Sequence, residues 1–265
     1  MQYALVDNAR REAFPGGKGL CPTCGADVVA KCGPRVIHHW AHAHRQSCDP
    51  WWENETQWHR DWKNLFPPEW REVPQVAPDG EIHRADVKTA HGIVVELQHS
   101  AISDVERLSR EHFYGDMLWV LDGHDFIKNF DIYHKLPDPS SDLAKDLVWS
   151  KGTRQQQGAA KGIFMRLSEN PGASKLQRFC GTMHFFYEIE DEVNAAYHGP
   201  HQYDWVRPRQ AWLESGCPVY IDFGGENLVR LEKYDEYRLP CIRLISREEF
   251  VRGALSVART AEIGC

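Results

Sequence analysis

The feature that constrains this chain most is a segment, residues 15 to 50, that is rich in glycine, cysteine and histidine and poor in apolar side chains. A segment of this composition cannot build a core of its own and needs a cross-link, such as a bound metal ion, to hold it together. It contains a Cys-Pro-Thr-Cys motif at residues 21–24 and, after a spacing of 14 residues, a His-Trp-Ala-His motif at residues 39–42. Zinc takes thiolates and imidazole nitrogens in tetrahedral sites, and four protein ligands make such a site structural. We therefore predict a structural zinc ion held by Cys21, Cys24, His39 and His42.

The identity of the four ligands stays open at this stage, because further cysteines and histidines lie close in the sequence. The residues that could replace one of the four are Cys32, His38, His44 and Cys48. The alternative is that these side chains are ordinary buried thiols and surface imidazoles. The remaining cysteines are scattered singly, which does not fit a disulfide framework and favours a reducing compartment.

The composition indicates a soluble protein of the cell interior. The chain has 265 residues, 42% of them hydrophobic, which is enough for a sizeable core. Its mean hydropathy is −0.55, no apolar run reaches the roughly 18 residues that span a bilayer, and the first residues lack the pattern of a signal peptide. We therefore expect a cytoplasmic location and no membrane partner. The net charge of −7 would not draw a polyanion to the whole molecule, so any contact with nucleic acid must be local.

Residues 51 to 122 carry a regular succession of periodic segments separated by turn signals. We predict a helix at residues 51–66, strands at 71–76, 82–88 and 93–98, a second helix at 103–114 and a buried strand at 117–121. Ser103 and Glu106 form a capping box at the start of the second helix, and Val105 and Leu108 are its expected buried stripe. The fold class that follows is α/β, with a mixed sheet in an α+β core.

This succession divides the chain into three expected parts. They are an N-terminal metal-binding element at residues 1–50, a core at 51–135 and a C-terminal α/β extension of unknown role at 136–265. The extension contains predicted strands at 219–223 and 241–245, and Ser246 with Glu249 caps a final helix. A local excess of basic residues fits either a loop that tracks a nucleic-acid strand or a polar linker; it consists of Lys145, Lys151, Arg154, Lys161 and Arg166.

The loop between the second and third strands aligns them with each other. If they form a hairpin around the three-residue loop at 90–92, residues whose numbers add up to 182 face each other. Asp86 then faces Glu96, Arg84 faces Gln98, and all four side chains lie on one face of the sheet. Two opposed carboxylates repel unless a cation lies between them, so the pair predicts a site for Mg²⁺ or Mn²⁺. The alternative is a structural hairpin with a charged outer face.

Each predicted helix adds polar side chains at helical spacing. The first carries a stripe of Glu55, His59 and Lys63 opposite Trp58, Trp62 and Leu65. Placed beside the sheet, Glu55 or His59 would complete the coordination of the cation, and Lys63 would contact a phosphate. The second helix carries a stripe able to contact phosphates, which consists of Arg107, Arg110 and Tyr114. Either stripe alone fits a solvated surface equally well.

Taken in order, these motifs resemble the competence protein CoiA-like proteins of the PD-(D/E)XK nuclease superfamily. The landmarks cover about residues 20 to 122: the two zinc motifs, the stripe of the first helix, Arg-Ala-Asp-Val at 84–87, Val-Glu-Leu-Gln-His-Ser at 95–100, then Ile102, Ser103, Arg110 and Tyr114. The resemblance implies a restriction-endonuclease-like, metal-dependent nuclease core behind a zinc-ribbon-like element, which handles DNA during uptake and recombination. Gln98 stands where the superfamily has a lysine, a substitution that CoiA-like proteins also carry.

From these residues and this resemblance we expect a metal-dependent nuclease that hydrolyses phosphodiester bonds in DNA. Asp86 and Glu96, with Glu55 or His59, would hold Mg²⁺ or Mn²⁺. Gln98 would orient the attacking water, and Lys63 would steady the phosphates. The residues expected to contact the nucleic acid are Arg84, Arg107, Arg110 and Tyr114.

Two other functions compete with this expectation. The main rival is a nuclease-derived module that grips DNA or a recombination protein without cutting, which Gln98 and the acidic net charge favour. A zinc hydrolase built on the histidine cluster ranks lower, because no glutamate lies between the histidines as in His-Glu-x-x-His. The strandedness of the nucleic acid and the oligomeric state are open at this stage.

Overall fold

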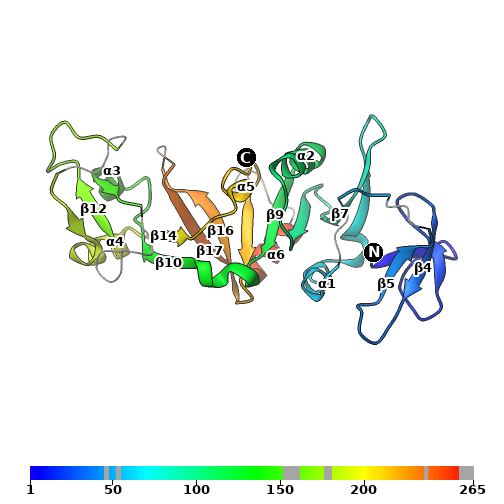
Figure 1. The fold of residues 1–265 in the computed structure, drawn as a ribbon. Coiled ribbons are helices and arrows are strands. Elements are labelled where there is room, and N and C mark those ends of the chain that lie inside the picture. The colour runs from blue at the N-terminus through cyan, green and yellow to red at the C-terminus, as the bar shows by residue number, and fades with distance from the viewer. Residues whose placement is uncertain (45–47, 52–54, 152–161, 176–180, 236–237, 257–265) are drawn as a thin grey trace. The chain divides into compact units, whose positions relative to one another are not determined.

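The computed structural model describes the chain except for residues 45–47, 52–54, 152–161, 176–180, 236–237 and 257–265 (Figure 1). The chain divides into two compact units. Unit 1 consists of Met1–Asp122 together with Glu248–Cys265, and unit 2 consists of Gly123–Arg247. Unit 2 is therefore an insertion in the sequence of unit 1. Each unit combines strands and helices, which agrees with the predicted α+β class.

The N-terminal part of unit 1 is a five-stranded antiparallel sheet in the order β2-β1-β3-β4-β5. Its strands are β1 (Tyr3–Val6), β2 (Ala9–Glu12), β3 (Lys18–Leu20), β4 (Asp27–Lys31) and β5 (His39–His42). Among the described residues, its hydrophobic core cluster has five buried members, namely Met1, Ala4, Cys21, Val28 and Trp40. A core this small fits the expectation that the segment needs a cross-link.

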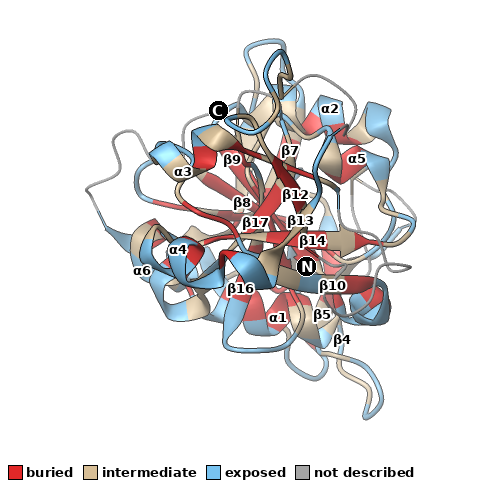
Figure 2. Cartoon of the chain, turned by 90° about the vertical axis from the view of Figure 1, so that its left-hand side faces the viewer, coloured by how far each residue is buried: buried red, intermediate tan, exposed pale blue. Residues whose placement is uncertain are grey.

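The rest of unit 1 contains the predicted order of helix, three strands, helix and strand. The strands are β6 (Arg71–Val76), β7 (Ile82–Lys88), β8 (Val94–Gln98) and β9 (Met117–Asp122), and they lie in the order β9-β8-β7-β6. The pairs β6–β7 and β7–β8 are antiparallel, whereas β8 and β9 are parallel. All of β8 and nearly all of β9 are buried, as expected for strands paired in parallel inside a core. Figure 2 shows this burial as red that is concentrated in the strands.

The first helix is shorter than predicted. The structure places α1 at Gln57–Asn64, followed by a 3₁₀ turn at Pro68–Trp70, so the predicted start at Trp51 is wrong. The reason is a capping box: the Thr56 hydroxyl accepts from the His59 amide, and the His59 ring accepts from the Thr56 amide. Leu65, expected on the apolar stripe, is 42% exposed.

The second helix, α2 (Asp104–Tyr114), is capped by Ser103 as predicted, but its buried face is not the predicted one. Val105 is 80% exposed and Leu108 is 55% exposed, whereas Arg107 and Arg110 are buried. Both arginines reach carboxylates, Arg107 on Glu111 at 2.6 Å and Arg110 on Glu96 at 3.2 Å. The apolar stripe therefore predicted the wrong buried face. Leaving a buried carboxylate without a cationic partner costs more free energy than burying two further aliphatic side chains would gain.

The last helix of unit 1 follows unit 2 in the sequence. Helix α6 (Arg247–Leu255) packs the ring of Phe250 edge-on against Trp62 of α1, with 5.7 Å between the ring centroids. The predicted final helix after Ser246 is confirmed. In the residues that the structure describes, no helix is long and apolar enough to cross a membrane.

Unit 2 contains five strands that pair antiparallel and a small three-stranded sheet. The five strands have the order β10-β14-β17-β16-β15, with bounds Phe130–Lys135, Pro200–Trp205, Pro240–Ser246, Asn227–Lys233 and Val219–Asp222. The small sheet consists of β11 (Leu147–Trp149), β12 (Ile163–Arg166) and β13 (His184–Phe185). The helical segments are His124–Asn129, α3 (Asp142–Asp146), Phe186–Glu188, α4 (Glu190–Ala195) and α5 (Gln210–Leu213). The predicted strands at 219–223 and 241–245 are confirmed, and Arg154 and Lys161 of the expected basic loop lie outside the described residues.

Candidate metal centre and acidic cavity

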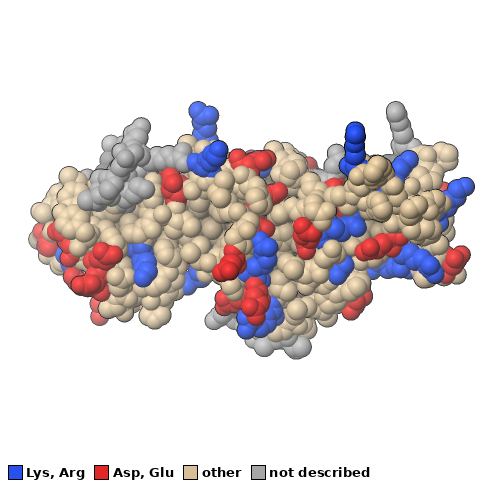
Figure 3. Space-filling model, turned by 90° about the horizontal axis from the view of Figure 1, so that it is seen from below, with Lys and Arg blue, Asp and Glu red and all other residues tan. Residues whose placement is uncertain are grey.

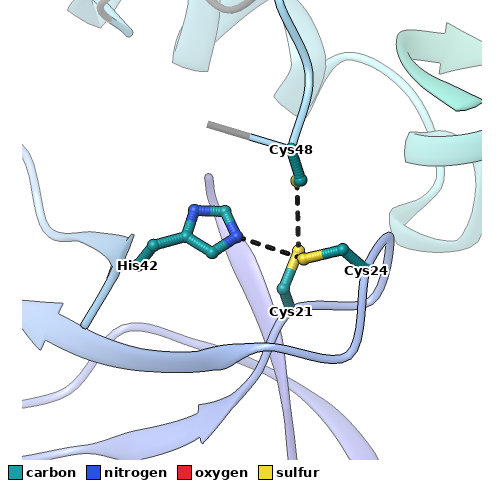
Figure 4. A group of neighbouring side chains, drawn as sticks. All are labelled: Cys21, Cys24, His42 and Cys48. Carbon is teal, nitrogen blue, oxygen red and sulfur yellow. Dashed lines mark hydrogen bonds between the residues drawn. The ribbon is translucent and has the colours of Figure 1, made fainter. Parts of the chain in front are cut away.

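Four side chains of the N-terminal segment converge on one point. Their ligand atoms, from Cys21, Cys24, His42 and Cys48, all lie within 4.8 Å of one another (Figure 4). The Sγ atoms of Cys21 and Cys48 are 3.8 Å apart, and Cys24 Sγ is 3.4 Å from His42 Nε2. In a tetrahedral zinc site, bond lengths of about 2.3 Å to sulfur and about 2.0 Å to nitrogen put neighbouring ligands roughly 3.5–3.8 Å apart. The donor set and its spacing therefore fit a zinc-like ion.

Local backbone structure presents these ligands. Directly after β3, the Gly25 amide donates to Cys21 O at 2.9 Å and the Cys21 amide donates to Ala26 O at 2.8 Å, which turns the chain tightly. Gly25 has φ +72°, in the left-handed region that favours glycine. His42 is paired with Val28 in the β4–β5 ladder, beside this turn.

Cys48 replaces His39 in the predicted ligand set. The prediction uses both histidines of the His-Trp-Ala-His motif as ligands, but residues 39–42 form strand β5. Side chains three positions apart on a strand point to opposite faces, so His39 and His42 cannot reach the same ion. The His39 ring instead contacts Ile37 O at 2.8 Å. Cys48 was one of the alternatives that the sequence left open, and Cys32, His38 and His44 lie outside the cluster.

The electrostatics of the cluster favour a bound cation. Burial opposes ionisation of Cys21, but hydrogen bonds from the Cys24 and Thr23 amides outweigh it and lower the pKa of that thiol. Burial, and then the charge of Cys21, raise the pKa of Cys48 to about 12. Burial also lowers the pKa of His42, which keeps its ring neutral. A metal ion would supply the positive charge that a second thiolate needs here.

A second group of polar side chains surrounds a small cavity, of about 50 Å³, in unit 1. The volume accommodates a few waters or a partly hydrated ion. The lining side chains come from the segment before α1, from α1, from β6 to β8 and from α2. They include Asp49, Glu55, His59, Lys63, Glu72, Arg84, Asp86, Glu96, Arg110 and Tyr114.

The cavity lies where β7 and β8 separate. Their ladder pairs Val87 with Val95 and Lys88 with Val94, which is the predicted register, and no further pairs follow in the described strands. Beyond these two pairs, side-chain carboxylates accept the backbone hydrogen bonds that carbonyl groups of a neighbouring strand would otherwise accept. The Asp86 amide donates to Glu96 Oε1 at 3.1 Å, the Leu97 amide donates to Asp86 Oδ2 at 3.0 Å, and the Arg84 amide donates to Asp49 Oδ2 at 3.0 Å. We call this opening, bounded by residues 84–86 and 96–97, the fork.

Asp86 and Glu96 face each other across the fork and have unequal environments. Burial, and then the charge of Asp86, raise the pKa of Glu96 to about 8, although Arg110 at 3.2 Å acts in the opposite direction. Among the described acids that line the cavity, Asp86 alone has no basic side chain within 4.0 Å. A divalent cation between these two carboxylates would offset their mutual repulsion and give Asp86 a positively charged partner. The residues present therefore fit such an ion.

The first-helix stripe reaches the same cavity, but its members have other partners. Glu55 forms ion pairs with Arg60 at 2.8 Å and with Lys63 at 2.5 Å. His59 contacts the Thr56 hydroxyl at 2.9 Å and Leu97 O at 3.2 Å, so both of its ring nitrogens are engaged. Within the described residues, neither joins Asp86 and Glu96 as a third ligand inside 4.8 Å. The expected third ligand is therefore not in place: ion pairs occupy Glu55, which lies just before α1, and hydrogen bonds occupy both ring nitrogens of His59.

Lys63 is also placed differently from the expectation. Its side chain is 3% exposed, and its ammonium lies 2.5 Å from Glu55 and 2.9 Å from Glu72. Burial alone would raise the pKa of Glu72, but Lys63 and Arg84 hold that pKa well below its ordinary value. A lysine held in this way stabilises the wall of the cavity and does not reach out to a phosphate.

The remaining predicted residues divide into two groups. Arg84, Arg110 and Tyr114 line the cavity. Arg107 forms an ion pair with Glu111 within α2 and does not line the cavity. Gln98 is buried, its Nε2 donates to Ser100 O at 3.2 Å, and it is not among the residues that line the cavity. Gln98 therefore does not lie where it was expected, beside an attacking water in the cavity.

Two lining acids, Asp49 and Glu72, were missed by the sequence reasoning. The β6–β7 ladder pairs Val73 with Ala85, so Glu72 faces Asp86. The Pro-Asp-Gly turn at 78–80 would have given this register from the sequence. Glu72 adopts φ +47°, a left-handed conformation that is strained for glutamate, and its carboxylate accepts from the Gln2 amide at 2.8 Å. Asp49 had one signal only, its position directly after Cys48.

One face of the chain carries charges of both signs. On the face drawn in Figure 3, Lys and Arg side chains are interspersed with Asp and Glu.

Comparison with known proteins finds a similarity over the metal-binding segment. Residues 12–50 match the family model described as the competence protein CoiA, N-terminal domain. The match contains all four side chains of the metal cluster and ends directly after Asp49. No curated protein matches the chain, and no solved structure matches it. The resemblance to CoiA proteins is therefore supported over the metal-binding segment.

Proposed function

We propose that this chain is a divalent-metal-dependent nuclease that hydrolyses phosphodiester bonds in DNA. The observation that carries the proposal is the pair of opposed carboxylates at the fork, Asp86 without a basic partner and Glu96 with its pKa raised to about 8. Such a pair is stabilised by a cation and has no use in a protein that only contacts a phosphate backbone. The similarity of residues 12–50 to a domain of a competence protein favours DNA as the substrate.

The residues of the cavity divide the work as follows. Asp86 and Glu96 hold Mg²⁺ or Mn²⁺, which when bound lowers the pKa of a water and neutralises charge on the scissile phosphate. Magnesium keeps several waters and uses one or two carboxylates, so two protein ligands suffice. Arg84 lines the cavity and presents its guanidinium group to the phosphate oxygens, while Arg110, which is bound to Glu96 and Glu106, holds the Glu96 carboxylate in place. Burial raises the pKa of Tyr114, so its hydroxyl remains a neutral donor at the wall.

A second candidate function is a nuclease-derived module that binds DNA or a recombination protein without cutting it. Two observations favour it. Lys63 is bound by Glu55 and Glu72, and Gln98 does not line the cavity, so neither of these two side chains takes the role expected of it towards the phosphate or the water.

The test is cleavage of end-labelled single-stranded, duplex and branched DNA with Mg²⁺, with Mn²⁺ and with chelator. The proteins are wild type, Asp86→Asn, Glu96→Gln and the control Glu69→Gln, which removes an exposed carboxylate outside the cavity. We expect metal-dependent product from wild type and control, and a loss of about 100-fold or more in the two cavity variants. Product from Glu96→Gln at the wild-type rate would contradict the proposal. DNA binding that metal strengthens, with no product from any protein, would establish the second candidate.

A further inference from the structure

The metal cluster and the fork are joined by a very short piece of chain, residues 48–51. Cys48 is a ligand of the metal cluster, and Asp49 is the next residue. Pro50 fixes its own φ and restricts the residue before it, which leaves this connection little conformational freedom. Because Asp49 is only 7% exposed, its carboxylate is enclosed by the rest of unit 1.

Asp49 binds the strand that carries Asp86. Its Oδ2 accepts from the Arg84 amide at 3.0 Å, and its Oδ1 accepts from the Trp51 amide at 3.0 Å. Oδ1 also lies 2.9 Å from His83 Nδ1. The carboxylate therefore takes the place of a missing strand partner on β7, two residues before Asp86.

Trp51 contacts β7 and is also linked to the other side of the fork through Arg110. Its ring stacks on His83 of β7, with the centroids 3.2 Å apart and the planes at 9°. Its carbonyl oxygen accepts from Arg110 Nη2 at 2.9 Å, and Arg110 Nη1 lies 3.2 Å from Glu96 Oε2. The segment thus contacts both walls of the cavity, β7 through Asp49 and Glu96 through Arg110.

We propose that metal binding at the Cys21, Cys24, His42 and Cys48 cluster holds the fork in place through Asp49, which acts as a positioning residue for β7. Loss of the ion frees Cys48, and with it the carboxylate that satisfies the Arg84 amide. An unsatisfied buried amide then opens to water, and β7 moves away from β8. The coupling is carried by contiguous hydrogen bonds between described residues, and it holds whether or not the chain cuts DNA.

The test is hydrogen exchange of single backbone amides in the full chain, with zinc bound and after zinc removal by a chelator. The Arg84 and Trp51 amides report on Asp49. The Gly25 amide, which donates to Cys21 O, reports that the metal turn has loosened. The control is the Thr89 amide, which donates to Ile93 O at 2.9 Å at the far end of β7. We expect zinc removal to speed exchange at Arg84 and Trp51 by about tenfold or more, and at Thr89 by less than about twofold.

The variant Asp49→Ala separates the connection from the metal itself, because alanine has no side-chain acceptor for the Arg84 amide. We expect it to bind zinc normally and to show fast exchange at Arg84 even with zinc present, so that zinc removal changes that amide no further. The proposal is overturned if Gly25 loses protection while Arg84 keeps its rate. It is equally overturned if zinc removal accelerates Arg84 in Asp49→Ala as much as in wild type, or accelerates Arg84 and Thr89 alike.

Discussion

At the scale of single residues, the cavity is built from charges that compensate one another in a fixed pattern. Lys63 forms ion pairs with Glu55 and Glu72, and Arg110 forms one with Glu96. Asp86 has no ion pair with a described basic side chain. Groups buried to this extent are stable only while their partners remain, because an isolated buried charge has lost its hydration without compensation. The unpaired position of Asp86 is therefore the most informative property of the site.

Glu72 should make the stability of unit 1 depend on acid. Its pKa is held well below the ordinary value of 4.5, so its contribution is complete above about pH 4.5 and is lost as the pH falls through the lower, folded value. We expect Glu72→Gln to lower the free energy of unfolding by about 3 kcal/mol at pH 7. The difference from wild type should shrink between pH 5 and pH 3.

Urea unfolding at a series of pH values measures this difference. Glu69→Gln, which removes an exposed carboxylate of the same unit, is the matched control and should follow wild type. A Glu72→Gln difference that is the same at pH 3 and pH 7 would show that the carboxylate is not ionised against Lys63 in the folded chain.

At the scale of elements, α2 is an amphipathic helix with its polar side inward. Its buried face is held by Arg107 and Arg110, while Val105 and Leu108 lie on the exposed face. We expect Leu108→Gln to change the free energy of unfolding by less than about 0.5 kcal/mol. Arg110→Gln should destabilise by about 3 kcal/mol, since it leaves Glu96 beside Asp86 without a cation.

Thermal unfolding of the two variants, which lie on the same helix, checks this order. A Leu108→Gln variant that is less stable than Arg110→Gln would mean that the apolar stripe is covered in the folded chain. Adding Mn²⁺ should restore more stability to Arg110→Gln than to wild type, because the ion replaces the lost guanidinium charge.

The elements also show which features sequence patterns can predict. The register of β7 with β8 was predictable because a loop of fixed length leaves one alignment, so Asp86 and Glu96 were found together. The inward faces of α1 and α2 were predicted only in part: Trp62 is buried as the pattern indicates, but the pattern rule leaves charged residues outside the core. Lys63 and Arg110 are paired with carboxylates on β6 and β8 that lie 9 and 14 residues away in the sequence, which is beyond the three- or four-residue spacing of a helical pattern. His39 was assigned wrongly because the motif spacing alone does not show that residues 39–42 form a strand, which turns His39 and His42 to opposite faces.

At the scale of the whole molecule, the two units are stabilised by different means. Unit 2 has a core cluster of nine buried residues around Leu136, Phe164 and Val193. The N-terminal sheet of unit 1 has a cluster of five, so we expect an ion bound at the metal cluster to contribute a large share of its folding free energy. The two units should therefore respond differently when the metal is removed.

We predict one zinc ion per chain, held by Cys48 and not by His39. Cys48→Ser should lose the ion, whereas His39→Ala should keep it, because His39 points to the opposite face of β5. Elemental analysis of the purified proteins measures the stoichiometry, and calorimetry measures the consequence. A chelator should lower the unfolding temperature of unit 1 in wild type and His39→Ala, leave Cys48→Ser unchanged, and leave the transition of unit 2 where it was. Retention of zinc by Cys48→Ser together with its loss from His39→Ala would restore the ligand set expected from the sequence and remove the connection from the metal to Asp49.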